Sequence, residues 1–152
     1  MSSPSSRKRL LFLLPFAPRL DATHGGGRVL AQFVTLLSAR HSVALLCLRA
    51  PDEPSVDQSL RAQCEIVEEI VRPSNGLLLP QRCLCSMRTL TSLLMGRPRW
   101  ATFWAVSEYT ARLRSLVRLW KPDIVQIEYH VMGQYLSALG SRVGPWAGPR
   151  LR

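Results

Sequence analysis

Two short, uninterrupted apolar runs within the first fifty residues constrain the fold most strongly. The first covers residues 10–14 and ends at Pro15, and the second covers residues 43–48. Strands that are covered on both faces have such continuous runs, whereas half-exposed strands alternate. Between the runs, residues 29–40 repeat apolar side chains three and four positions apart, which predicts a helix. This strand–helix–strand order predicts an α/β fold with a parallel sheet.

The rest of the chain continues the alternation of strands and helices. Strands are predicted over residues 64–71 and 123–128, with a helix as the alternative for the first of these. Helices are predicted over residues 81–95, 106–120 and 132–139, a loop over residues 50–59, and a turn over residues 73–76. The expected fold is a Rossmann-like parallel sheet flanked by helices. Residues 1–8 are expected to be a disordered tail, and residues 140–152 an irregular end.

Composition limits the classes of partner. The chain has 152 residues, enough for one domain, and its 47% apolar and 20% charged residues are typical of soluble globular proteins. Its net charge of +10 is compatible with nucleic acid, an anionic membrane surface or an anionic substrate. The arginines are scattered, and no basic run is longer than residues 7–9. A nucleic-acid partner is therefore not expected.

Cysteines and apolar segments indicate the compartment. Cys47, Cys64, Cys83 and Cys85 lack the spacing of a disulfide framework or a metal site, so free thiols and no metal are expected. No segment reaches the about 20 uninterrupted apolar residues of a transmembrane helix. Residues 7–14 resemble a signal peptide, but the apolar run is short and no cleavage motif follows. The predicted location is the cytoplasm, and peripheral attachment to the inner membrane face is compatible with it.

The loops after the first and last predicted strands are the places where chemistry is expected. Ligands of parallel sheets bind beyond the carboxyl ends of the strands. Residues 15–27 include His24, Gly25, Gly26 and Gly27, and Arg28 follows them directly. Glycines let backbone N–H groups approach a ligand, and a helix N-terminus favours an anion such as a phosphate. The alternative is a flexible connection, because the dinucleotide fingerprint G-x-G-x-x-G is absent.

The loop over residues 128–133 supplies the other candidates. Glu128 and His130 can bind a hydroxyl group, and either can accept its proton. The alternative for Glu128, Tyr129 and His130 is a cluster that caps the next helix. Asp21, in the first loop, is expected to be solvated.

Basic and aromatic residues in the second half have two interpretations. Arg97, Arg99, Trp100 and Trp104 can form a surface patch that binds an acceptor or an anionic bilayer. Core packing is favoured for Trp104 and Trp120. Three further arginines are expected to lie on a solvated helix face: Arg112, Arg114 and Arg118.

The order of these motifs resembles family 4 glycosyltransferases. The resemblance covers residues 9–139 and rests on L-F-L-L-P-F-A-P at residues 11–18, G-G-G-R at residues 25–28, S-V-A-L-L-C-L at residues 42–48 and K-P-D-I-V-Q-I-E at residues 121–128. The family implies a GT-B architecture, in which two Rossmann-like domains face each other across a cleft. Its N-terminal domain mostly holds the acceptor, and its C-terminal domain holds most of the nucleotide-sugar, with a carboxylate motif of the E-x(7)-E kind.

The resemblance implies that this chain is the N-terminal half of a GT-B fold. Such an enzyme transfers a hexose from a nucleotide-sugar, its co-substrate, to a hydroxyl acceptor, and needs no metal at the sugar phosphates. Residues 24–28 match the segment that contacts the diphosphate of the nucleotide-sugar donor in this family. Glu128 and His130 match the polar strand end only approximately. Since nothing after Leu139 is long enough for the second domain, that domain is expected to be absent and the fragment inactive alone.

Two other classes of function remain as alternatives. One is a non-catalytic basic module that binds a membrane surface or an anionic partner through its arginines. The other is a nucleotide-binding Rossmann domain of another function. The sequence argues against the latter, because Cys47, Leu48 and Arg49 stand where an acidic ribose-binding residue is expected.

Overall fold

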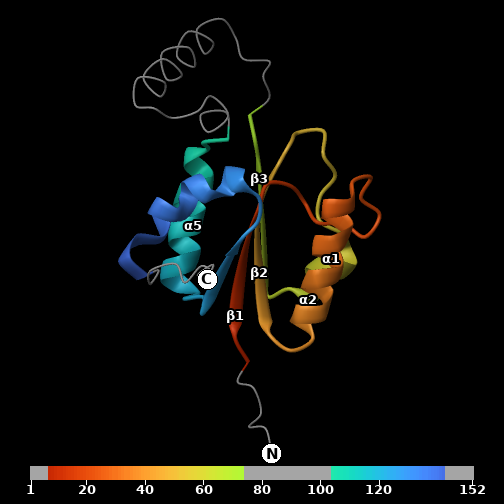
Figure 1. Ribbon diagram of the computed structural model, residues 1–152, viewed down its shortest axis with the longest axis horizontal. Coiled ribbons are helices and arrows are strands. Elements are labelled where there is room, and N and C mark those ends of the chain that lie inside the picture. The colour runs from red at the N-terminus through yellow and green to blue at the C-terminus, as the bar shows by residue number, and fades with distance from the viewer. Residues whose placement is uncertain (1–6, 74–103, 143–152) are drawn as a thin grey trace, which may run out of the picture.

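A computed structural model describes residues 7–73 and 104–142 of the chain (Figure 1). Four parallel strands form a sheet in the order β3-β2-β1-β4. The strands are β1 (Arg9–Leu14), β2 (Ser42–Arg49), β3 (Ile66–Val71) and β4 (Ile124–Ile127). The predicted class, an α/β fold with a Rossmann-like parallel sheet, is confirmed.

Helices cover both faces of the sheet. Helices α1 (Gly25–Ser38) and α2 (Gln58–Gln63) lie on one face, and helices α5 (Ser107–Leu119) and η1 (His130–Arg142) lie on the other (Figure 1). Each face therefore has its own apolar core, and the sheet separates the two.

Strand β1 lies at the centre of this arrangement and contributes to both cores. Leu10, Phe12 and Leu14 belong to the core beneath α1 and α2. Leu11 and Leu13 belong to the core beneath α5 and η1. Leu10 is 7% exposed and the next four side chains are at most 1% exposed. Burial on both faces is the reason that the run is apolar at every position.

Most predicted elements are present with shifted ends. The helix predicted over residues 29–40 begins earlier, at Gly25, and ends at Ser38. The strand predicted over residues 64–71 covers Ile66–Val71, and the one predicted over residues 123–128 covers Ile124–Ile127. The helix predicted over residues 106–120 covers Ser107–Leu119. Its inward side carries Tyr109, Leu113 and Leu116, and these side chains are buried together with that of Trp120, which follows the helix.

Two predictions are corrected. The loop predicted over residues 50–59 is too long, since α2 begins at Gln58. This six-residue helix buries only Leu60, so it leaves no periodic apolar pattern in the sequence. The segment predicted as an ordinary helix over residues 132–139 is part of the 3₁₀ element η1, which is interrupted at Gly140, where φ is 67°. Its buried positions recur three and four residues apart, a spacing that both helix types share.

Several predictions lie outside the described residues. These are the helix over residues 81–95, nearly all of the turn over residues 73–76, most of both chain ends, and the candidates Cys83, Cys85, Arg97, Arg99 and Trp100.

The hydroxyl of a buried tyrosine ties α5 to the middle of the sheet. Tyr109 is fully buried and donates a hydrogen bond to the carbonyl oxygen of Leu46, with 2.8 Å between the oxygens. Its ring packs on that of Tyr135, with centroids 4.5 Å apart. Burial raises the pKa of the Tyr109 phenol well above its ordinary value. The side chain therefore stays neutral in the folded protein.

This burial predicts that the fold loses stability in alkali. Burial also raises the pKa of Cys47 well above its ordinary value, and raises the pKa of Cys64 from 9.0 to about 11. Because the unfolded chain releases the Cys64 proton at lower pH, the stability that Cys64 contributes is complete below pH 9 and is lost as the pH rises toward 11; the raised pKa values of Tyr109 and Cys47 act in the same direction. We expect the free energy of unfolding, measured in urea, to fall steadily across this range. Cys64→Ala should reduce the fall, and a flat profile in the unaltered protein would contradict the argument.

Candidate functional site

The loops that follow β1 and β4 meet at the carboxyl edge of the sheet. Strands β1 and β4 are direct neighbours, with Leu13 opposite Ile127. Phe16, just after β1, contacts Tyr129, just after β4, and their ring centroids are 5.3 Å apart. The sequence-based prediction that these two loops share one edge is confirmed.

The three successive glycines lie in the first turn of α1, not in the loop before it. His24 is the N-cap residue, and its Nδ1 accepts a hydrogen bond from the backbone N–H of Gly27 at 3.0 Å. This bond places the proton of a neutral His24 ring on Nε2. The first turn contains no acidic residue, so no carboxylate within it compensates the helix dipole. This helix N-terminus therefore favours negative charge.

Close packing explains two of the glycines. A methyl group at Gly27 would lie 2.7 Å from the Cβ of Ala22 and 2.9 Å from the Cε1 of His24. A methyl group at Gly26 would clash with the Tyr129 hydroxyl, whereas one at Gly25 would meet nothing within 4 Å. The Tyr129 hydroxyl thus lies directly against the first turn of α1.

Three rings form an aromatic group at this edge, consisting of Phe16, His24 and Tyr129. Phe16 contacts both other rings edge to face, His24 with centroids 4.7 Å apart and Tyr129 with centroids 5.3 Å apart. Tyr129 is 48% exposed and has a φ of 64°, in the left-handed region that residues with a Cβ rarely adopt. Backbone strain of this kind is found at binding and catalytic sites more often than elsewhere.

The Arg28 side chain is directed toward the backbone of the loop before α1. Its side chain is exposed, and its Nε donates to the carbonyl oxygen of Ala22 at 2.5 Å. This bond joins the first turn of α1 to the preceding loop. The guanidinium therefore adds positive charge near the helix N-terminus.

Glu128 and His130 flank Tyr129 in the sequence, and Glu128 follows β4 directly while His130 is the first residue of η1. The Glu128 Oε1 accepts a hydrogen bond from the Gln126 side-chain amide at 3.0 Å, and its backbone N–H donates to the Leu13 carbonyl oxygen at 3.1 Å. His130 is exposed at the start of η1. The structure places both residues at the predicted edge of the sheet.

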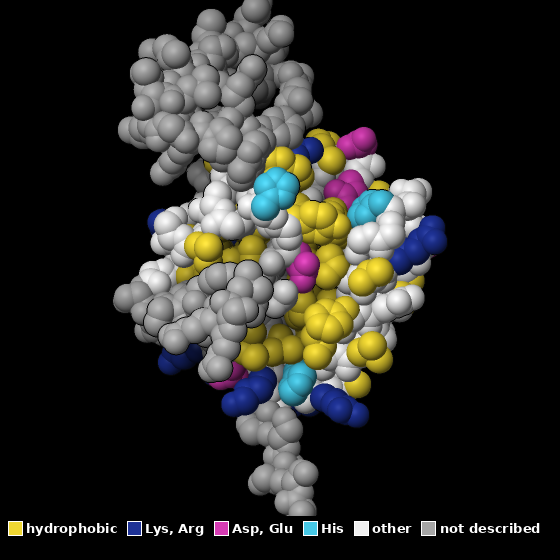
Figure 2. All heavy atoms as spheres, viewed as in Figure 1, with side chains coloured by type: hydrophobic (Ala, Val, Ile, Leu, Met, Phe, Trp, Pro, Cys, Tyr) yellow, Lys and Arg dark blue, Asp and Glu magenta, His cyan; other side chains and the backbone are white. Residues whose placement is uncertain are grey.

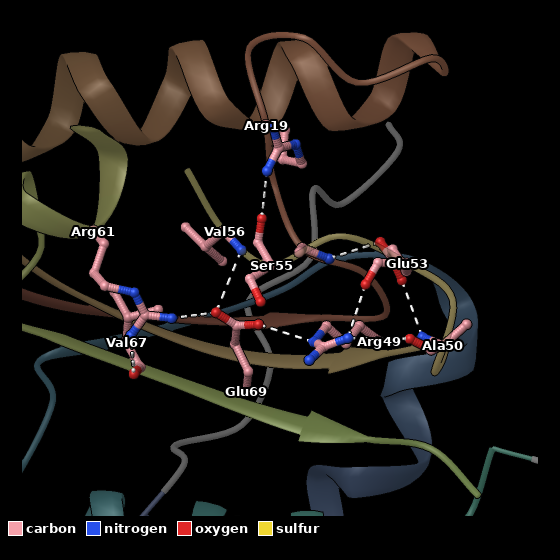
Figure 3. A network of polar contacts seen from close by, with 10 residues as sticks. Arg19, Arg49, Ala50, Glu53, Ser55, Val56, Arg61, Val67 and Glu69 are labelled. Atoms are coloured by element: carbon pink, nitrogen blue, oxygen red, sulfur yellow. Dashed lines mark hydrogen bonds and ion pairs between the residues drawn. The ribbon is translucent and has the colours of Figure 1, made fainter. Parts of the chain in front are cut away.

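A network of arginines and carboxylates near this edge was not predicted (Figure 3). Glu69 of β3 forms ion pairs with Arg49, at 2.9 Å, and with Arg61. Glu53 accepts backbone N–H bonds from Ala17 and Ala50.

Phe16 was also missed as a site residue, because a single aromatic residue after a strand has no distinguishing pattern.

Arg19 and Asp21 form an exposed ion pair in the loop before α1. The Arg19 Nε lies 2.7 Å from the Asp21 Oδ1, and the Asp21 side chain is 68% exposed. The hydrogen bond from Arg19 lowers the pKa of Asp21, and the same bond raises the pKa of Arg19. Asp21 is solvated as predicted, and it is also paired.

The predictions for α5 and its neighbouring aromatics are confirmed. Trp120 is buried and donates from its indole nitrogen to Glu65 at 2.9 Å. Trp104 packs against the core beneath α5, and the Arg72 guanidinium lies 4.2 Å from the centroid of its ring. Three arginines of α5 are exposed, namely Arg112, Arg114 and Arg118.

Within residues 7–73 and 104–142, no three histidine, cysteine or acidic side chains gather as metal ligands would. No helix in the same part of the chain is long and apolar enough to span a bilayer. No protein-family model, curated protein or solved structure matches the chain.

Proposed function

We propose that this chain is the acceptor-side half of a GT-B sugar transferase. The meeting of the α1 N-terminus with the loop after β4 supports this most directly. Backbone N–H groups, the aromatic group and two polar residues share one edge of a parallel sheet. Ligands of parallel α/β proteins bind at this edge. The motifs that resemble family 4 glycosyltransferases lie in β1, α1, β2 and β4, the elements that build it.

In the proposed reaction, a hexose passes from a nucleotide-sugar to an acceptor hydroxyl. The leaving diphosphate gains charge in the transition state, and preorganised N–H donors and a helix N-terminus stabilise such charge. Gly25, Gly26 and Arg28 would supply these donors from this half. No metal is needed in this scheme.

Glu128 and His130 would act on the acceptor. Either side chain can hold a sugar hydroxyl by a hydrogen bond. An inverting transfer needs a general base for the attacking hydroxyl, and either can accept its proton. A retaining transfer uses them for binding only.

Titration of the ¹⁵N-labelled chain with a nucleoside diphosphate hexose tests the proposal. We expect the largest amide shifts at Gly25, Gly26 and Tyr129. Arg28→Ala should weaken binding several-fold because it removes charge beside the site. Arg118→Ala removes another exposed arginine, on α5, and should leave binding unchanged. The proposal fails if the nucleotide-sugar shifts no amide at this edge, or if both arginine variants weaken binding equally.

A basic module on an anionic membrane is the rival function. Three arginines that it could use are ion-paired, namely Arg19, Arg49 and Arg61. Figure 2 shows the lysine and arginine side chains of one face spread around its rim, with hydrophobic side chains between them. Sedimentation with phosphatidylglycerol vesicles separates the two functions. Salt-sensitive binding to these vesicles without nucleotide-sugar binding would favour the membrane module.

A further inference from the structure

Side-chain hydrogen bonds join two loops at the carboxyl edge, over residues 15–24 and 50–57 (Figure 3). The Glu53 carboxylate contributes one oxygen to each loop. Its Oε1 accepts the backbone N–H of Ala17 at 2.9 Å, and its Oε2 accepts that of Ala50 at 3.0 Å. Asp57 adds a parallel connection, since its Oδ2 accepts the backbone N–H of Leu20 at 2.9 Å. Two carboxylates from the second loop thus hold the backbone of the first.

The sheet in turn fixes the loop that carries Glu53. Arg49, the last residue of β2, donates from Nη1 to the Glu53 carbonyl oxygen at 2.8 Å. The Nε of the same guanidinium binds Glu69 of β3. Glu69 also accepts the backbone N–H of Val56 at 3.3 Å. The Glu53 carboxylate is therefore held from a rigid part of the molecule, and it can act as a fixed point for the first loop.

The residue that Glu53 holds is next to the aromatic group. Ala17 follows Phe16 directly, and Ala17 is only 2% exposed. The Phe16 ring contacts both His24 and Tyr129. Because Phe16 and Ala17 share a peptide bond, fixing the Ala17 backbone also restricts the position and direction of the Phe16 side chain.

We propose that Glu53 is a positioning residue for the aromatic group. Its carboxylate fixes the backbone at Ala17 and so keeps the Phe16 ring in contact with His24 and Tyr129. The inference goes beyond the proposed function, because it concerns how the three rings are held in place. It applies whichever ligand binds at this edge.

The two-oxygen geometry requires a carboxylate. A carboxylate offers acceptors at both oxygens, whereas an amide offers one acceptor and one donor group. Glutamine at position 53 can accept from only one of the two backbone N–H groups. Bonds from backbone N–H groups to a carboxylate are also stronger than bonds to a neutral oxygen. Glu53→Gln should therefore give a partial effect, and Glu53→Ala a full one.

Hydrogen exchange and aromatic NMR spectra test the assignment. In Glu53→Ala, we expect the Ala17 amide to exchange at least about tenfold faster, because a charged acceptor is lost. The ring resonances of Phe16, His24 and Tyr129 should shift together, while core amides of β1 and β2 keep their protection. Glu53→Gln should give smaller changes in the same resonances. Asp52→Ala removes an exposed carboxylate from the same loop and should change none of them.

Three results would overturn the proposal. One is an unchanged Ala17 exchange rate in Glu53→Ala. Another is faster exchange spread evenly over β1 and β2, which indicates general loss of stability. If Glu53→Ala does not fold, Glu53→Gln decides, and unaltered ring resonances in that variant would refute the role. Failure of the proposed function is separate, since it is read from nucleotide-sugar binding by chains in which Glu53 is unaltered.

Discussion

Replacing Glu69 by alanine is expected to lower the free energy of unfolding by about 3 kcal/mol. The Glu69 side chain is 9% exposed and pairs with Arg49, whose side chain is 19% exposed. Its removal leaves the Arg49 guanidinium largely buried without a balancing charge, and leaves the Val56 N–H without its acceptor. Urea unfolding followed by circular dichroism measures the change.

The neighbouring Glu68 provides a matched control. Glu68 also lies in β3 and pairs with an arginine, but its contact with Arg112 is 3.7 Å long and the Arg112 side chain is 58% exposed. Solvated pairs of this kind contribute less than about 1 kcal/mol. Glu68→Ala should therefore be nearly neutral. Equal losses in the two variants would show that burial of the Glu69 pair has no special energetic role.

Gly27→Val is expected to destabilise the protein by about 2–3 kcal/mol. The new side chain would overlap the Cβ of Ala22, which can move only with its backbone. It would also press on His24, whose ring accepts the Gly27 N–H and caps α1. The variant should therefore lose both stability and nucleotide-sugar binding. Thermal unfolding and the NMR titration measure the two effects.

The adjacent glycines separate crowding from the loss of a glycine. Gly25→Ala meets open space and replaces glycine by a better helix former, so it should be neutral or more stable by up to about 1 kcal/mol. Gly26→Ala displaces only the end of the Tyr129 side chain, and it should shift the Tyr129 resonances with little loss of stability. A destabilised Gly25→Ala would contradict the assignment of the effect to packing.

Local patterns predict the elements that bury continuous or periodic apolar faces. Examples are the apolar runs of β1 and β2 and the buried positions of α5. In each, the spacing of apolar residues in the sequence follows directly from the faces that are buried. Helix α2 has one buried residue and leaves no such record. The start of α1 was misplaced because glycine is a weak helix former, and because the acceptor of the N-cap bond from the Gly27 N–H is histidine, a residue type seldom associated with capping.

The candidate site was predictable in place but not in detail. Parallel topology alone places the loops after β1 and β4 at one edge, and the structure confirms that they meet. The Glu53 bond to Ala17 joins residues 36 positions apart, and no local periodicity records such a contact. The same is true of the closeness of Tyr129 to Gly26, which depends on the pairing of β4 with β1.

The strand order has a consequence for synthesis on the ribosome. Strand β1 emerges first, yet one of its two neighbours, β4, is made last among the described strands. The contact between the Arg9 backbone and Asp123 spans 114 residues. Until β4 arrives, the apolar central strand of the nascent chain has an open edge, and such edges promote aggregation. Pairing of such distant segments also slows folding. The chain is thus expected to depend on chaperones most strongly during the interval in which β2 and β3 are paired and β4 is still missing.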